Sequence, residues 1–290
     1  GKELLPRSIE IESIAEALPI ERKSIPATKK KKAVERSSID QRIDYRWIDL
    51  RTEENQLIFK VQTCMANAMR QFLLERNFID IHTPNLIGAA SESGSEVFEV
   101  KYFDRNAYLA QSPQFYKQMA MAAGFERIFE VGPVFRAEKS YTSRHTTEFT
   151  GFDLEFSFID SFRDVMAMEE ALLTHMLKTV KEAYGDQIRE LFGKEVIVPT
   201  TPFPVMSLAE LYTELEREFG YQIPESEHGD LTTDAEHLSY ELVQKKFGHE
   251  FLFVTDFSAE KRAFYHMRKD GVPQGYDLIW RGTEITTGAQ

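Results

Sequence analysis

The stretch FRAEKSYTSRHTTEFTGFDLEF, residues 135–156, decides the fold class of this chain of 290 residues. It joins two longer segments, RIFEVGPVFRAE at 127–138 and TEFTGFDLEFSF at 147–158, whose patterns are typical of strands. The residues between them, KSYTSRHT at 139–146, form a polar loop. Arg136 and Glu138 then share one face of the first strand, because strand side chains repeat every two residues. The most polar cluster of the chain therefore lies between two apolar strands.

Polar and aromatic side chains of this cluster are of the kinds that bind a nucleotide. The guanidinium of Arg136 can hold a phosphate at two points, and Phe149 offers a flat ring. The same residue types would also suit a buried lattice of ion pairs, so the residues alone leave both hypotheses open. The loop and the second strand contribute Arg144, His145, Glu148, Phe149 and Asp153.

Working outward, strands are grouped with strands and helices are interposed in blocks. Apolar residues at three- and four-residue spacings predict a helix over 56–78, followed by a strand, FIDIHTP, that stops at Pro84. Further helices are predicted at 113–123, 163–183, 207–219 and 233–247, and strands at 96–104, 106–111, 251–255, 263–267, 276–280 and 283–287. This grouping favours an α+β fold, a mostly antiparallel sheet flanked by helices, over a doubly wound parallel sheet.

The N-terminal residues differ from the rest. Residues 8–18, SIEIESIAEAL, alternate apolar and polar and predict a short half-buried strand, but residues 1–20 are too few for a domain. We therefore interpret 1–20 as the end of an upstream domain, 21–38 as a hinge linker and 39–290 as the main domain. The lysine run 29–32 in the linker is either a solvated charged segment or a contact to a phosphate backbone.

Composition and charge exclude several classes of protein. The formal net charge of −12 ordinarily argues against a nucleic-acid partner, but residues 22–51 carry +6 while 52–290 carry −15. Cys64, the single cysteine, cannot form an internal disulfide or a CxxC metal site, which indicates a reducing, cytoplasmic location. No apolar stretch approaches the ~18–20 residues of a membrane span, so no membrane association is expected.

A second cluster lies in YDLIWRGTEITTG, residues 276–288. If Arg281-Gly282 is a two-residue hairpin turn, Asp277 pairs with Thr286 and emerges on the same face as Glu284. Two carboxylates on one face, with Thr287 nearby, suit Mg²⁺ that also binds substrate phosphates. The alternative is that one carboxylate pairs with an arginine of residues 135–156.

These stretches resemble the class II aminoacyl-tRNA synthetases. FRAEKSYTSRHTTEF is similar to motif 2, and the helix running into FIDIHTP is similar to motif 1, whose proline, here Pro84, lies at the dimer interface in that family. SESGSEVF (91–98), QSPQFYKQM (111–119) and YDLIWRGTEITTGAQ (276–290) resemble the aspartyl-tRNA synthetases of the archaeal and eukaryotic-like type, and DYRWIDLR (44–51) resembles the start of their catalytic domain. The resemblance implies the class II catalytic fold for 39–290, and the last strand of an anticodon-binding OB-fold barrel for 8–18.

The resemblance also implies roles for individual residues. ATP would be bound by Arg136 at the α-phosphate, Glu138 at the adenine amino group or the loop, Arg144 and His145 at the outer phosphates, and Phe149 by stacking. Asp277 and Glu284 would hold Mg²⁺, and Glu284 would also contact ATP. Aspartate would be bound by Ser91, Glu92, Gln114, Lys117, Asp153 and Thr287. An ammonium at Lys117 suits aspartate and not asparagine, because a neutral amide would leave a desolvated charge without its counterion.

The activity implied is that of an aspartate–tRNA ligase with Arg136 and Glu138 as catalytic residues, with ATP and Mg²⁺ as cofactors. Its partners would be L-aspartate, an aspartate or also an asparagine tRNA, and a second copy of the chain around Pro84. Alternatives are an asparaginyl-tRNA synthetase, an asparagine synthetase paralogue, or a non-catalytic binding paralogue. The motif 3 arginine of the family and the arginine expected after Gln290 are not among the 290 residues. We therefore expect a fragment that is inactive by itself. Thr283 also stands where the family commonly has an acidic residue.

Overall fold

The computed structural model describes residues 3, 5–23, 35–91, 97–138 and 146–290. The chain divides into two compact units, one made of residues 1–63 and 184–195, the other of 64–183 and 196–290. Every strand of the described residues belongs to the second unit. That unit therefore carries the predicted site.

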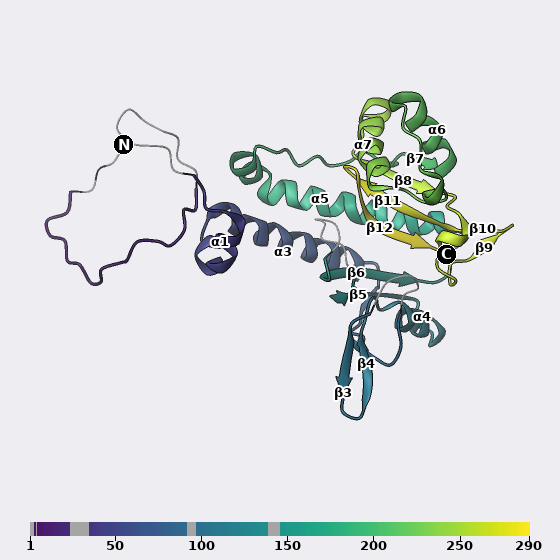
Figure 1. Ribbon diagram of the computed structural model, residues 1–290, viewed down its shortest axis with the longest axis horizontal. Coiled ribbons are helices and arrows are strands. Elements are labelled where there is room, and N and C mark those ends of the chain that lie inside the picture. Colours follow the sequence, from purple (N-terminus) through teal and green to yellow (C-terminus); the bar gives the residue numbers. More distant parts are fainter. Residues whose placement is uncertain (1–2, 4, 24–34, 92–96, 139–145) are drawn as a thin grey trace. The chain divides into compact units, whose positions relative to one another are not determined.

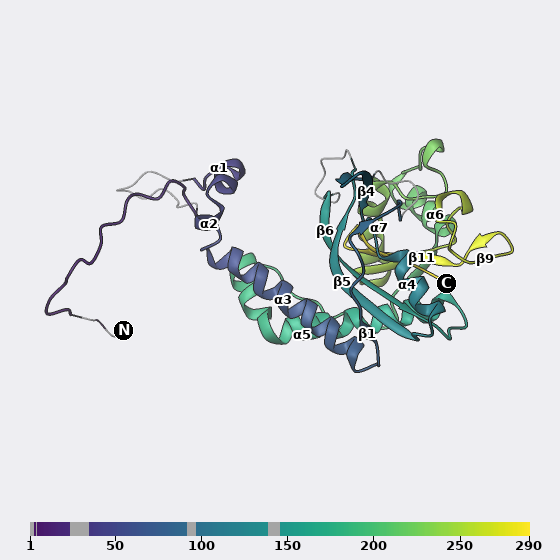
Figure 2. The ribbon, with the colours of Figure 1, turned by 90° about the horizontal axis from the view of Figure 1, so that it is seen from below.

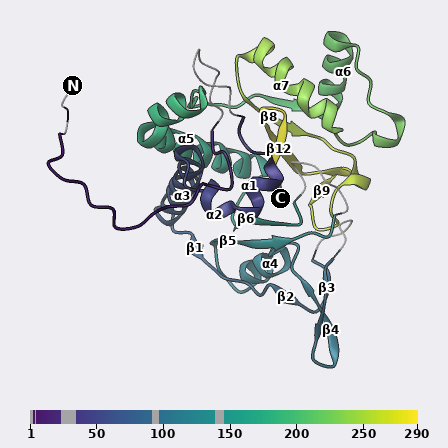
Figure 3. The same ribbon diagram turned by 60° about the vertical axis from the view of Figure 1, so that its left-hand side comes forward.

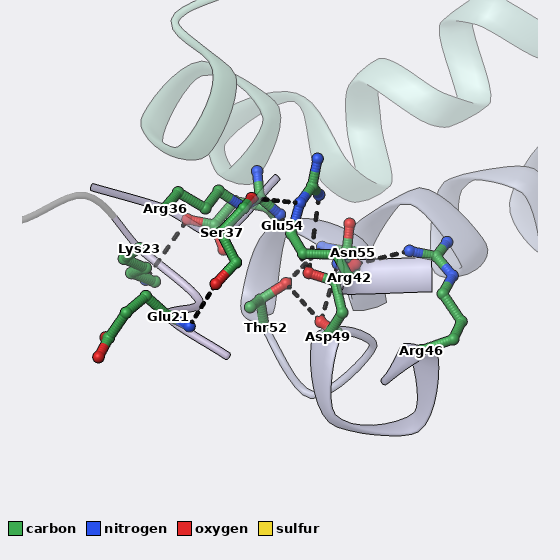
Figure 4. Close-up of polar contacts among 10 residues, drawn as sticks. All are labelled: Glu21, Lys23, Arg36, Ser37, Arg42, Arg46, Asp49, Thr52, Glu54 and Asn55. Atoms are coloured by element: carbon green, nitrogen blue, oxygen red, sulfur yellow. Dashed lines mark hydrogen bonds and ion pairs between the residues drawn. The ribbon is translucent and has the colours of Figure 1, made fainter. Parts of the chain in front are cut away.

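The first unit is organised around one buried carboxylate. It contains α1 (Ile39–Asp44), α2 (Arg46–Asp49) and the beginning of α3 (Glu53–Leu74). Asp49 is fully buried, and three guanidiniums and an amide surround its carboxylate (Figure 4). Its partners are Arg36 at 3.3 Å, Arg42 at 3.7 Å, Arg46 at 2.6 Å and Asn55 at 3.0 Å. Without these partners the carboxylate would be a buried charge with no compensation, so the cluster holds residues 36–55 together.

Residues 8–18 do not form the predicted strand. The structure describes them without helix or strand, and Ile9, Ile11 and Ile14 are largely exposed. A strand needs neighbouring strands to satisfy its backbone N–H and C=O groups, and the described residues offer none beside this segment. They also contain no closed barrel. The prediction of a strand at 8–18 is therefore wrong for this structure.

The first sheet of the second unit is built on the predicted pair of strands. β5 (Arg127–Phe135) and β6 (Glu148–Phe156) pair antiparallel over their whole lengths, and β1 (Ile79–Asp80) pairs parallel with β5. Within this unit, the second half of α3 and the first part of α5 (Phe162–Phe192) lie side by side (Figure 2) and contribute Phe72 and Leu172 to a core with Phe129. α4 (Gln114–Ala122) packs against β5 and β6 (Figure 3).

The second sheet has the order β12-β11-β8-β7 and carries two helices (Figure 1). Ser207 and Glu210 form a capping box at the start of α6, and Gly220 ends this helix in the left-handed conformation. The sheet and both helices bury one continuous apolar core. The elements are β7 (Val205–Ser207), α6 (Leu208–Phe219), α7 (Thr233–Phe247), β8 (Phe251–Thr255), β11 (Gly275–Trp280) and β12 (Thr283–Ala289).

Shorter elements complete the unit. These are a three-stranded sheet, a small hairpin and two single turns of 3-10 helix. They are β2 (Leu86–Ile87), β3 (Glu99–Tyr102), β4 (Arg105–Leu109), η1 (Glu225–Glu227), η2 (Ala259–Lys261), β9 (Arg268–Lys269) and β10 (Val272–Pro273). Most strand pairs are antiparallel, with β1–β5 and β7–β8 the parallel ones among the described residues. The predicted α+β class is therefore confirmed.

Two strand predictions need correction. Residues 263–267, AFYHM, form a turn and not a strand, because the guanidinium of Arg268 collects the carbonyl oxygens of this segment, among them His266 at 2.7 Å and Ala263 at 3.3 Å. β5 ends at Phe135, so Arg136 and Glu138 lie just beyond the strand and not on it. The backbone N–H of Arg136 still donates to Thr147, which keeps this residue at the mouth of the loop.

Candidate active site

The β11–β12 hairpin has the predicted turn and an unexpected bulge. Arg281 and Gly282 both have positive φ, as a two-residue hairpin turn of type I′ requires. The register then shifts between Leu278 and Ile279, which leaves Ile285 as an extra residue on β12. Asp277 therefore pairs with Thr287 and not with Thr286, so the predicted pairing is wrong by one residue.

The bulge brings together the oxygen atoms of Asp277, Glu284 and Thr287, the three residues predicted to lie near Mg²⁺. The Thr287 hydroxyl lies 2.9 Å from Oδ1 of Asp277 and 3.0 Å from Oε1 of Glu284. Desolvation and the charge of Asp277 raise the pKa of Glu284 to about 7, and the charge of Glu236 adds to this. A hydroxyl carries one proton, so Thr287 can donate fully to only one carboxylate. A protonated Glu284 can itself donate to Thr287, which makes the chain of hydrogen bonds complete.

Asp277 pairs with an arginine that was not among the predicted residues. Arg262 contacts it with two nitrogens, Nη1 to Oδ1 at 2.8 Å and Nη2 to Oδ2 at 2.5 Å. The guanidinium carbon of Arg262 also lies 3.6 Å from the centre of the Phe257 ring. Among the described residues, the arginine that pairs with this carboxylate is Arg262, which lies outside residues 135–156. A turn and the hairpin β9–β10 lie between Arg262 and Asp277 in the sequence. The spacing of nearby residues therefore gives no sign of this pair.

The same cluster has the ligand chemistry that suits Mg²⁺. Asp277, Glu284 and Thr287 offer hard oxygen atoms, the ligands that Mg²⁺ prefers when it also binds phosphates. Their chemistry fits, although Arg262 engages both oxygens of Asp277. Among the residues that the structure describes, no group of three or more His, Cys, Asp or Glu side chains is placed to hold a metal ion.

The opposite face of the hairpin rests on a buried carboxyl group. Glu169 of α5 accepts hydrogen bonds from the hydroxyls of Tyr276, at 2.7 Å, and Thr286. Burial raises the pKa of Glu169, and the charge of Asp277 raises it further. Glu169 therefore ties β11 and β12 to α5 from behind. Glu169 was not predicted, although a carboxylate within the apolar face of a helix is a usable signal.

Two residues predicted to bind aspartate, Lys117 and Asp153, lie together. Lys117 of α4 is 6% exposed, and its Nζ lies 3.0 Å from Oδ1 of Asp153 and 3.7 Å from Oε2 of Glu155 on β6. Burial and the charge of Asp153 raise the pKa of Glu155, against the opposing effect of Lys117. Glu155 was not predicted, although it follows Asp153 by two residues and so faces the same way.

Ser91 holds the segment before α4. Its Oγ accepts from the backbone N–H groups of Gln111 and Ser112, each at 3.3 Å, and its own N–H donates to Oε1 of Gln111 at 3.1 Å. The Ser112 hydroxyl accepts from the N–H of Gln114, which begins α4 and is half-buried. This places Gln114 on the helix that carries Lys117. Glu92 lies outside the described residues.

The predicted ATP residues are described in part. The guanidinium carbon of Arg136 lies 5.5 Å from the centre of the Phe149 ring, a cation–π contact. The Nε of Arg136 is buried and has no hydrogen-bond partner among the described residues. A buried unpaired donor costs about 1–3 kcal/mol, which suits a position that an anionic ligand completes. Glu138 lies two residues on, and Arg144 and His145 lie outside the described residues.

The predicted site residues thus lie in two groups, both in the second unit. β11 and β12 bring Asp277, Glu284 and Thr287 together, while α4 and β6 bring Lys117 and Asp153 together.

Of the helices that the structure describes, none combines the length and the apolar character needed to cross a membrane.

Comparisons with known proteins agree on one family. A family model described as tRNA synthetases class II (D, K and N) matches residues 38–290. The aspartate–tRNA(Asp/Asn) ligase of Methanopyrus kandleri is 42% identical over 100% of this chain and 64% of its own length. The chain therefore spans less than two thirds of this relative.

Two solved structures share the fold. Aspartyl tRNA synthetase from Entamoeba histolytica is 35% identical, with a TM-score of 0.77 over 90% of this chain and 50% of that one. Asparaginyl-tRNA synthetase from Pyrococcus horikoshii, complexed with asparaginyl-adenylate, is 30% identical, with a TM-score of 0.73 over 87% of this chain and 57% of that one. Both substrate types thus occur on this fold.

Proposed function

Because this chain belongs to the class II tRNA synthetases of the D, K and N group, we propose that the protein is an aspartate–tRNA ligase. It would activate aspartate with ATP and transfer it to the 3′ end of a tRNA. The observation that carries the choice of aspartate is the buried ammonium of Lys117 beside Asp153. The 42% sequence identity to an aspartate–tRNA(Asp/Asn) ligase supports the same choice.

The Lys117–Asp153 pair can exchange its partners for a substrate of matching charges. The ammonium of a bound aspartate would contact Asp153, and its side-chain carboxylate would contact Lys117. Every buried charge then keeps a partner, which a desolvated site requires. With asparagine, the neutral amide would leave Lys117 without a negative partner from the substrate. Discrimination against asparagine therefore comes from an uncompensated charge.

The first chemical step needs alignment and charge neutralisation. An oxygen of the aspartate α-carboxylate attacks the α-phosphorus of ATP, and the bond to the leaving pyrophosphate breaks. A carboxylate is already a nucleophile, so no residue has to remove a proton. Arg136, with its buried Nε and its contact to Phe149, would neutralise the α-phosphate while the ring supports adenine. Glu138 would contact the adenine amino group or order the loop.

A metal ion, a tRNA and a second copy of the chain complete the proposed function. Mg²⁺, held by Glu284 and Asp277, would neutralise phosphate oxygens. In the second step the terminal ribose hydroxyl of the tRNA attacks the adenylate carbonyl, and AMP leaves. The proposed partner is an aspartate tRNA, with an asparagine tRNA as a further candidate. The proposed protein is a homodimer that pairs around Pro84, and its proposed location is the cytoplasm. Arg144, His145, Ser91, Glu92, Gln114 and Thr287 complete the proposed ATP and aspartate contacts.

Amino-acid-dependent exchange of pyrophosphate into ATP tests the function. On the full-length protein we expect exchange with aspartate and none with asparagine. Exchange with asparagine would favour an asparaginyl-tRNA synthetase or an asparagine synthetase paralogue. Absence of exchange with either amino acid would favour a non-catalytic binding paralogue.

A further inference from the structure

We propose that Arg262 is a positioning residue that occupies Asp277 in the nucleotide-free protein, so that the β11–β12 site binds a divalent cation firmly only together with phosphate. This inference rests on the proposed function, because it concerns the same carboxylates. Its subject is the cluster of Arg262, Asp277, Thr287 and Glu284. Arg262 acts through Asp277 and is not assigned a contact with substrate.

The pair is a fixed one. Two nitrogens of Arg262 contact the two oxygens of Asp277, and the side chains are only 10% and 7% exposed. Phe257 covers the guanidinium from one side, at 3.6 Å. A two-point contact of this kind fixes direction as well as distance. Asp277 therefore has a two-point cationic partner within the chain itself.

The backbone around Arg262 is held as firmly as its side chain. Arg268 donates to the carbonyl oxygens of Ala259 at 3.3 Å and of Arg262 at 3.2 Å. The same guanidinium contacts Ala263, Phe264 and His266. One arginine thus fastens the turn that presents the other. The position of Arg262 over β11 is a built feature of the turn, which indicates a role beyond filling space.

The charges then decide how a metal can bind. A cation held by two carboxylates needs both of them free, but Arg262 already compensates one. A metal ion beside Arg262 would be repelled by the guanidinium, in surroundings where burial weakens screening. To use Asp277, the ion must displace Arg262 from a desolvated pair. Phosphate groups of ATP bring the negative charge that makes this exchange favourable, and free metal alone does not.

Metal binding to the nucleotide-free, full-length protein tests the proposal. Mn²⁺ is the probe, and the unbound ion is counted by electron paramagnetic resonance in the absence of ATP, aspartate and tRNA. We expect weak binding by the wild type and at least about tenfold tighter binding by Arg262→Met. Adding Asp277→Asn to Arg262→Met should remove the gain. Arg281→Met is the matched control, because Arg281 pairs with Glu250 at the turn of the same hairpin.

A second variant and a second measurement guard against loss of folding. Arg262→Lys keeps the charge but allows only a one-point contact, so it should show a smaller gain than Arg262→Met. The rise of the melting temperature on adding Mn²⁺ should be larger in both variants than in the wild type. The proposal is overturned if both variants bind Mn²⁺ no more tightly than the wild type and show no larger rise of the melting temperature. Because no exchange is measured, this result is separate from a failure of the proposed function.

Discussion

The ammonium of Lys117 lies 3.0 Å from the carboxylate of Asp153 and is almost completely buried. α4 and β6 come from distant parts of the sequence, and this contact joins them in the second unit. A buried charge pair is weak support for stability but a strong constraint on what can bind beside it. The pair therefore connects the fold to the proposed choice of amino acid.

Replacing Lys117 by Met should abolish aspartate-dependent exchange while ATP still binds. We expect kcat/KM for aspartate to fall by at least about 100-fold, or about 3 kcal/mol, because the substrate carboxylate loses its desolvated counterion. Lys245→Ala is the control, since Lys245 forms an exposed pair with Glu218. Pyrophosphate exchange and ATP binding are measured on both variants. Wild-type exchange in Lys117→Met would contradict the assignment.

Local patterns predicted the parts of the fold that local chemistry determines. The strands β5 and β6 follow from two strand-like segments on either side of a polar loop. The turn Arg281-Gly282 follows from two residues, one of them a glycine, between two further strand-like segments. Thr232 and Gly248 likewise begin and end α7 by side-chain capping and by a left-handed glycine. These signals act within a few residues, so a single sequence contains them.

Features that depend on distant residues could not be predicted in the same way. Arg262 is separated from Asp277 in sequence by a turn and a hairpin. Glu169 lies on α5, more than 100 residues before its partner Tyr276 on β11. The bulge at Ile285 adds one residue to β12, and a one-residue shift changes every later pairing. Residues 8–18 have the alternation of a strand, yet alternation supplies no pairing partner.

Replacing Glu169 by Ala should destabilise the second unit. The hydroxyls of Tyr276 and Thr286 would lose their buried acceptor, which costs about 2–4 kcal/mol in the free energy of unfolding. Glu169→Gln keeps an acceptor oxygen and should cost less than half as much. Glu182→Ala, an exposed position on the same helix, is the control. Urea unfolding measures all three, and equal stability of Glu169→Ala and Glu182→Ala would show that the network does not support the hairpin.

Replacing Gly288 by Ala should also destabilise the hairpin. A Cβ at Gly288 would lie 2.4 Å from ring atoms of Tyr276, so the buried ring or the strand has to move. Overpacking of this kind costs about 1–3 kcal/mol in the free energy of unfolding. A Cβ at Gly88 would meet nothing within 4 Å, which makes Gly88→Ala the matched control. The prediction fails if thermal unfolding does not separate the two variants.

Replacing Glu284 by Gln should change how stability depends on pH. Desolvation and the charge of Asp277 raise the pKa of Glu284 from 4.5 to about 7, so between these values the folded protein binds more protons than the unfolded one. The stability that Glu284 contributes is therefore complete below pH 4.5 and is lost as the pH rises to about 7. Glu284 is exposed, so solvent screens these charges and we expect a fall smaller than the two values imply. Urea unfolding across this range should show wild-type stability decreasing relative to Glu284→Gln, with Glu241→Gln, an exposed position on α7, as the control. An increase relative to Glu284→Gln would mean that the pKa of Glu284 is lowered by folding.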